Sequence, residues 1–213
     1  MNKSIAIIGK GPSVKRCKRD FVESFDEVAI CGRPVFDGYE EFIGERAHWD
    51  FSNNSATKYS NELVEKLGII GHISTANQEV PALKDFCPEF HDRFKPGGPS
   101  TGTAAFDWFL RHEGYDKIAL IGFDLFPVGE YLYYYKKEEW NPNTKYLLEP
   151  QFDEFDSEGL RLKPSGHKTE LTFEYMNSMF DKHKDKTFYL ITDYPFKERD
   201  NVKLKYRSTE DEN

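Results

Sequence analysis

The stretch that decides the fold is IAIIGKGPS, residues 5–13. Its four apolar residues form a strand pattern that runs into a turn bracketed by Gly9 and Gly11, and glycines let a backbone turn tightly and approach a ligand closely. Pro12 is typical of the first turn of a helix, where its missing N–H is not needed. The free N–H groups beyond it are therefore expected to face a phosphate, with the positive end of a helix dipole behind them. The alternative is an ordinary strand-to-helix turn, because the segment lacks the third glycine of a dinucleotide motif and the Gly-Lys-Ser/Thr ending of a P-loop.

Apolar strand patterns alternate with helical patterns along the chain. Strands are predicted at Ser4–Ile8, Glu27–Cys31, Ala47–Phe51, Gly68–Ile73, Lys117–Ile121 and Thr187–Ile191, and helices at Tyr59–Leu67, Thr103–His112 and Thr169–Lys182. Continuous apolar strands between helices indicate a parallel sheet that is covered on both faces. We therefore expect an α/β fold, a single Rossmann-like domain over residues 1–206 with a mostly parallel, doubly wound sheet. Residues 207–213 are expected to form a disordered acidic tail.

Two further segments carry small polar residues where a helix starts or a strand ends. The sequence PSTGT (99–103) opens an apolar helical run, and the strand that follows it breaks at GFD (122–124). A third segment, SGH (165–167), stands just before an amphipathic helix. Open α/β sheets hold ligands at the carboxyl ends of their strands, so we expect these segments to meet at one site.

Residues 125–164 break the alternation of strands and helices. They carry many aromatic residues, among them Tyr131, Tyr133 and Trp140, between charges and prolines. A loop of this length is usually a functional lid or disordered, and the aromatic content favours a lid that orders over substrate. The alternative is a helical insert whose tyrosines pack on the body of the protein.

Composition limits the class of protein. The 213 residues are 38% hydrophobic and 15% aromatic, enough for a core, and no apolar run is long enough to cross a bilayer. The start shows no signal peptide pattern, and the spacing of three cysteines (Cys17, Cys31, Cys87) suggests neither a disulfide framework nor a metal site. We therefore expect a soluble, cytoplasmic protein without an integral membrane segment. The net charge of −8 argues against nucleic acid as a partner.

The order of these motifs resembles that of sialyltransferases, which use CMP-activated sialic acids. The opening Gly-x-Gly-Pro-Ser and the Gly-His segment are similar to the bacterial enzymes, and residues 99–102 and 115–123 are similar to the S motif of animal sialyltransferases. The resemblance spans roughly residues 4–195. It implies a GT-A-variant-like fold and an inverting, metal-independent glycosyltransferase. Such an enzyme moves sialic acid, or a related acidic sugar, from a CMP-sugar donor to the hydroxyl of a glycan or other acceptor, and no motif identifies the acceptor.

The resemblance also implies roles for single residues. His167, one of six histidines, matches the Gly-His segment and would be the general base, a role that suits an imidazole near neutral pH; without the resemblance it would be a surface or capping histidine. Tyr131 and Tyr133 would hold the departing phosphate. This leaving group is a monoester, so hydroxyl donors and a helix N-terminus can replace a divalent metal. No Asp-x-Asp metal pair is present, and no cofactor is expected.

The donor site implied by the resemblance combines six segments of the chain. Gly11 and Ser13 would line the nucleotide. The full set of predicted donor-binding residues is Gly9, Lys10, Gly11, Pro12, Ser13, Gly32, Arg33, Asn53, Asn54, Ser100, Thr101, Gly102, Gly122, Phe123, Asp124, Tyr131 and Tyr133. Within it, residues 100–102 would meet the phosphate and the sugar carboxylate, and residues 122–124 would border the cytidine. Asn53 or Asn54 would contact the donor, unless the pair forms a turn with side chains bonded to the local backbone.

Two departures from the family pattern concern the sugar. Bacterial relatives carry Cys-Asn after the second strand, where this chain has Cys31-Gly32-Arg33, and family members commonly have asparagine where this chain has Lys10. A cation there would lie near a phosphate or carboxylate, so KDN or Kdo are alternatives to sialic acid. Two other functions stay open: an ATP- and Mg²⁺-dependent enzyme resembling archaeal pterin diphosphokinases, and a nucleotide- or glycan-binding module that has lost catalysis.

Overall fold

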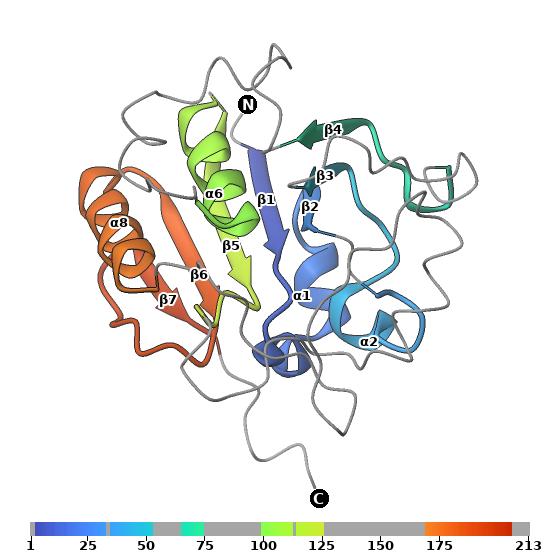
Figure 1. Ribbon diagram of the computed structural model, residues 1–213, viewed down its shortest axis with the longest axis horizontal. Helices are drawn as coiled ribbons and strands as arrows, with labels where there is room; N and C mark the ends of the chain where they lie inside the picture. Colours follow the sequence, from blue (N-terminus) through green and yellow to red (C-terminus); the bar gives the residue numbers. More distant parts are fainter. Residues whose placement is uncertain are drawn as a thin grey trace, which may run out of the picture.

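The computed structural model describes residues 3–32, 35–52, 65–74, 99–112, 114–125 and 169–205. The strands are β1 (Lys3–Ile8), β2 (Glu27–Cys31), β3 (Trp49–Ser52), β4 (Gly71–Ser74), β5 (Tyr115–Ile121), β6 (Thr187–Ile191) and β7 (Val202–Leu204). The helices are η1 (Pro12–Arg16), α1 (Arg19–Glu23), α2 (Glu40–Ile43), α6 (Thr101–Arg111) and α8 (Thr169–Lys182). The strands form one sheet in the order β4-β3-β2-β1-β5-β6-β7, and each neighbouring pair is parallel (Figure 1).

β1 shows why the strands are continuous apolar runs. Ile5 and Ile7 pack on one face of the sheet with α6 and α8, whereas Ala6 and Ile8 pack on the other face with η1, α1 and α2. All four side chains are fully buried. A strand that is covered on both faces needs apolar side chains on both, and the predicted doubly wound, parallel α/β sheet is confirmed.

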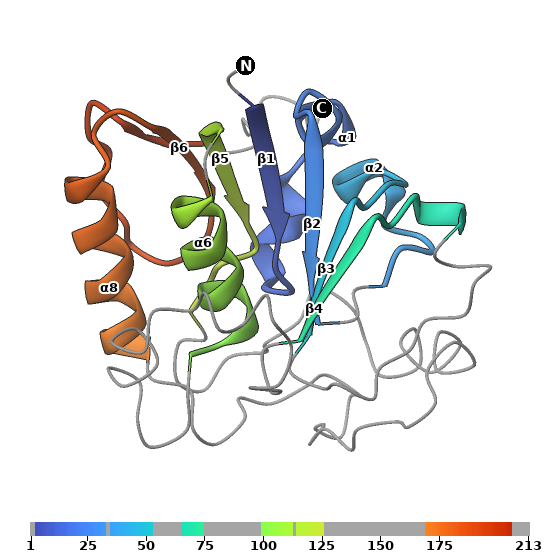
Figure 2. The ribbon, with the colours of Figure 1, turned by 90° about the horizontal axis from the view of Figure 1, so that it is seen from above.

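Among the described elements, α6 and α8 cover one face of the sheet, and α1 and α2 cover the other (Figure 2). Phe106 of α6 and Phe180 of α8 pack edge to face, with ring centroids 5.7 Å apart. A buried polar contact joins the same helices, since the carboxylate of Asp107 accepts hydrogen bonds from the hydroxyl of Tyr175 and from the guanidinium of Arg111. Within the described ranges, no helix combines the length and apolar character that crossing a membrane requires.

The structure adds elements to those predicted and moves others. The sequence patterns missed β7 and the short helices α1 and α2, and β4 begins at Gly71 rather than Gly68. Gly68 has φ +75° and follows helical residues 65–67, so it ends that helix and cannot begin a strand. The rest of the predicted helix Tyr59–Leu67, most of the predicted lid (125–164) and the predicted tail (207–213) lie outside the described residues.

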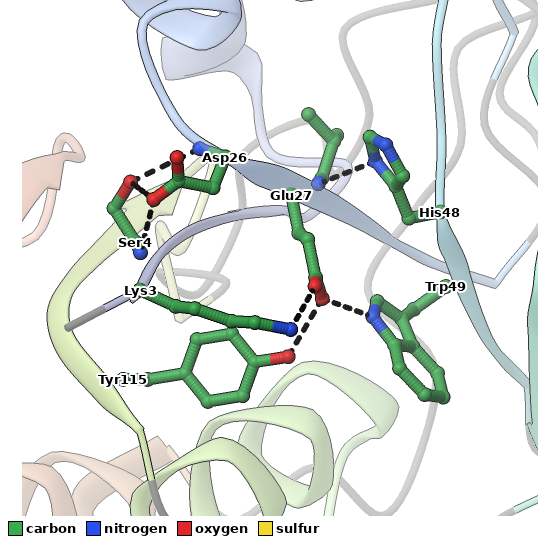
Figure 3. Close-up of polar contacts among 8 residues, drawn as sticks. Lys3, Ser4, Asp26, Glu27, His48, Trp49 and Tyr115 are labelled. Carbon is green, nitrogen blue, oxygen red and sulfur yellow. Dashed lines mark hydrogen bonds and ion pairs between the residues drawn. The ribbon is translucent and has the colours of Figure 1, made fainter. Parts of the chain in front are cut away.

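The amino ends of the strands carry a polar network centred on Glu27 (Figure 3). Its carboxylate accepts hydrogen bonds from Lys3 Nζ at 2.8 Å, from the Tyr115 hydroxyl at 2.6 Å and from Trp49 Nε1 at 2.7 Å. Burial alone would raise the pKa of Glu27, but these three donors hold it below its ordinary value. The network therefore ties β1, β2, β3 and β5 together at the edge opposite the carboxyl ends of the strands.

Candidate functional site

The carboxyl ends of β1 and β5 form the point where the direction of winding reverses. β1 lies between β2, which follows it in the chain, and β5, which comes much later. The arrowheads of β1 and β5 lie side by side and point the same way in Figure 2. In open α/β sheets this reversal is where ligands bind. The segments that leave the two strands, residues 9–13 and 122–124, both belong to the predicted donor site.

The glycine turn after β1 packs tightly against the turn after β5. The N–H of Gly9 donates to the carbonyl of Ile121 at 2.7 Å, and the N–H of Gly11 donates to the carbonyl of Gly122 at 3.0 Å. A Cβ added at Gly11 would lie 2.3 Å from Oδ2 of Asp124 and 2.7 Å from the Gly122 carbonyl oxygen. Gly11 therefore has no room for a side chain, as the close approach inferred from the motif requires.

The prediction that free N–H groups beyond Pro12 face a phosphate is wrong for the two that follow it. The N–H of Ser13 donates to Oδ2 of Asp124 at 2.8 Å, and that of Val14 donates to the carbonyl of Gly11 at 3.1 Å. The predicted helix is a five-residue 3₁₀ helix, η1, which aligns too few peptide units for a substantial dipole. The backbone of this turn is thus bonded within the protein.

Asp124 joins the ends of three strands. Its second oxygen, Oδ1, accepts from the N–H of Asp193 after β6 at 2.7 Å, and its side chain is buried. Two further contacts hold the same place: the Ser13 hydroxyl donates to the carbonyl of Ile191 at 3.0 Å, and Arg16 pairs with Asp193. Asp124 was predicted to border a cytidine, and in the structure both of its oxygens hold backbone. The sequence patterns did not connect Ile191 and Asp193 with the site, although a polar residue after the apolar run 187–191 was a usable signal.

The start of α6 lies against the end of β5. Ser100 caps the helix, with its hydroxyl oxygen accepting from the N–H of Thr103 at 3.2 Å. A Cβ added at Gly102 would lie 3.0 Å from the ring of Phe123, so residues 100–102 and 122–124 are neighbours, as predicted. The first N–H groups of an α-helix have no partner within the helix and carry the positive end of its dipole. The N-terminus of the 11-residue α6 can therefore attract an anion. The role expected for residues 100–102, to meet the phosphate and the sugar carboxylate, stays a prediction.

Lys10 and Gly32 meet across the ends of β1 and β2. Gly32 has φ +64°, and its N–H donates to the carbonyl of Phe51 at 2.7 Å. A Cβ added at Gly32 would lie 3.3 Å from Nζ of Lys10. Burial raises the pKa of the adjacent Cys31 thiol, and the charge of Asp50 raises it further, whereas the charge of Lys10 lowers it. A cation thus lies close to this edge of the sheet.

Six predicted site residues lie outside the described residues: Arg33, Asn53, Asn54, Tyr131, Tyr133 and His167. Their roles stay predictions. Two features stand next to them in the chain. Leu125 has φ +49°, a strained conformation for a leucine, and its carbonyl accepts from the Thr169 hydroxyl at the start of α8 at 2.8 Å.

Among the described residues, no group of three or more His, Cys, Asp and Glu side chains is arranged to hold a metal ion. Cys17 and Cys31 are buried and free, and Cys87 lies outside the described ranges.

The same fold occurs in solved sialyltransferases. The sialyltransferase CstII from Campylobacter jejuni, in complex with the substrate analogue CMP-3FNeuAc, is similar with a TM-score of 0.56 and 17% sequence identity, over 95% of this chain and 86% of that one. The same enzyme in complex with cytidine-5′-monophosphate is similar with a TM-score of 0.53 and 16% identity, over 95% and 84% of the two chains. No protein-family model matches this chain, and no curated protein matches its sequence. At this level of identity the likeness is one of fold: the chain has a fold similar to that of the sialyltransferase CstII.

Proposed function

We propose that the chain is a glycosyltransferase that takes sialic acid, or a related acidic sugar, from a CMP-sugar donor and attaches it to an acceptor hydroxyl. The observation that carries this proposal is the meeting of residues 9–13, 100–102 and 122–124 at the switch point between β1 and β5. Their order resembles that of CMP-dependent sialyltransferases. Support also comes from the fold, which is similar to that of an enzyme solved with CMP and with a CMP-sugar analogue.

The proposed reaction is a single displacement. The acceptor oxygen attacks the anomeric carbon while its proton passes to His167, and the bond from that carbon to the CMP phosphate breaks, so that CMP leaves with the electron pair. Attack on the face opposite the phosphate inverts the anomeric centre. Because CMP departs as a phosphate monoester, the hydroxyls of Tyr131 and Tyr133 and the N-terminus of α6 are proposed to stabilise it without a metal.

The contact at the start of α8 supports a place for His167 at this site. The Thr169 hydroxyl donates to the carbonyl of Leu125, directly after Asp124, so this end of α8 is held next to the end of β5. Consecutive Cα atoms are about 3.8 Å apart, so a residue two positions before Thr169 has its Cα within roughly 8 Å of it. A general base must come within hydrogen-bond reach of its proton, and this position in the chain is compatible with that need.

The test is the release of CMP from CMP-sialic acid. We expect parent protein to release CMP, slowly with water alone and faster with an acceptor hydroxyl. His167→Ala should retain its fold and CMP affinity but lose transfer by roughly a hundredfold or more, the usual contribution of a general base. The residual rate should no longer depend on an ionisation near pH 6.5, about the ordinary histidine value.

The matched control is His183→Ala, just beyond the other end of α8, which should transfer at the parent rate. A folded His167→Ala protein that transfers at the parent rate would place the base elsewhere. A parent protein that binds CMP but releases none from the donor would indicate a binding module that has lost catalysis.

A further inference from the structure

The glycine turn uses its own backbone N–H groups within the protein. Those of Gly9, Gly11, Ser13 and Val14 all donate to protein acceptors. A phosphate-binding turn ordinarily offers such groups to its ligand. These four N–H groups are therefore already used within the protein, and Lys10 supplies a cation in the same turn.

The neighbouring strand end leaves space for that side chain. Gly32 is held by its hydrogen bond to Phe51 and by φ +64°, and the position that its Cβ would occupy lies 3.3 Å from Nζ of Lys10 and 3.6 Å from Cε. Any larger residue at 32 would press on the ammonium group or displace it. The absence of a side chain at Gly32 and the position of Lys10 are thus parts of one arrangement.

The position of Lys10 favours strong binding of an anion. Its side chain is half-buried at the switch point, and charge interactions are screened less in such a place than on an open surface. Lys10 also has an interaction within the protein. An ammonium carries three N–H donors, more than a single acceptor uses.

We propose that Lys10 is a specificity-determining residue of the donor site, whose ammonium binds an anionic oxygen of the donor, and that Gly32 is small in order to admit it. This proposal rests on the proposed function. The anionic oxygen belongs either to the phosphate of CMP or to the carboxylate of the acidic sugar. The pair replaces the two asparagines found in the family pattern, so that an ammonium takes over from neutral amides.

Calorimetric titration of three ligands separates these sources. Cytidine carries neither anion, CMP carries the phosphate, and CMP-sialic acid carries both. If Lys10 binds the phosphate, Lys10→Met should weaken the binding of CMP roughly tenfold or more, as expected for a lost charge-assisted hydrogen bond, and leave the affinity for cytidine unchanged. If Lys10 binds the carboxylate, the variant should lose affinity for CMP-sialic acid only. Lys10→Arg should retain most of the affinity, and Lys15→Met, an exposed lysine of η1, should match the parent for all three ligands.

A second variant tests the space at Gly32 and covers the case in which Lys10→Met does not fold. Asparagine tolerates a positive φ, so the Gly32→Asn protein should fold. Its affinity should fall for the same ligands whose binding Lys10→Met weakens. Adding Gly32→Asn to a Lys10→Asn protein should reduce the affinity less than adding Gly32→Asn to the parent.

If the parent binds CMP, and Lys10→Met and Gly32→Asn each bind all three ligands as tightly as the parent does, the proposal is overturned and the proposed function stays intact. A parent that binds none of the three would overturn both.

Discussion

Asp124 is the residue on which the geometry of the candidate site depends most. It is buried, and an ionised carboxylate in such a place is costly unless hydrogen bonds compensate. Its two oxygens accept from the backbone of Ser13 at 2.8 Å and of Asp193 at 2.7 Å. The carboxylate thus fixes the glycine turn against the ends of β5 and β6.

Asp124→Asn should destabilise the fold and loosen the site. The carboxamide offers one acceptor oxygen, and its NH₂ group would face an N–H that needs an acceptor. We expect a loss of about 1–3 kcal/mol in the free energy of unfolding, the usual cost of leaving a buried group unpaired, together with weaker CMP binding. Chemical denaturation measures the first effect, with exposed Asp200→Asn as the control. Unchanged stability in the Asp124 variant would show that the two hydrogen bonds contribute nothing.

The sequence predicted single residues where the constraint is local. Gly11 was identified because a tight turn with close backbone approach needs glycine, and a Cβ there would indeed collide with Asp124. The use of the Ser13 N–H was not predictable, because its acceptor lies 111 residues away. The same limit hid how close the Lys10 ammonium lies to the space beside Gly32, because the two come together only when β1 and β2 pair.

At the scale of elements, long periodic segments were predicted well and short ones were not. The predicted helix Thr169–Lys182 has the bounds of α8, because its 14 residues repeat an apolar face. α1 and α2 have five and four residues, too few for a helical period to be recognised. β7 has three residues, and its pairing with β6 is a tertiary property.

The Glu27 network predicts how stability depends on pH. The pKa of Glu27 is held below its ordinary value of 4.5 in the fold, so its stabilising contribution is present above that value and is lost as the pH falls through the lowered pKa. Glu27→Gln should therefore melt at a lower temperature than the parent near neutral pH, with the gap narrowing below about pH 4. Thermal melts across this range measure the gap.

The control is Glu45→Gln, whose side chain is 58% exposed in an ion pair with Arg19. Exposed pairs contribute little, so this variant should follow the parent curve at every pH. A Glu27→Gln curve parallel to that of the parent would show that the network does not depend on the charge of Glu27.

At the scale of the whole molecule, the proposed chemistry predicts that activity does not depend on a divalent metal. The leaving group is a monoester that hydroxyl and backbone donors can stabilise. CMP release from CMP-sialic acid should therefore continue at the same rate after EDTA treatment. Loss of turnover on chelation, restored by Mg²⁺ or Mn²⁺, would contradict this.

The nucleotide that binds at the switch point tests the account of the whole molecule, because it separates a CMP-sugar transferase from an ATP-dependent enzyme with a similar opening motif. Calorimetric titration of the parent protein with CMP, AMP, UMP and ATP–Mg²⁺ compares the four under one condition. We predict that CMP binds most tightly, and that Gly11→Ala, which forces a methyl group against Asp124, weakens it. Binding of ATP–Mg²⁺ as tight as that of CMP, or tighter, would contradict the proposed function.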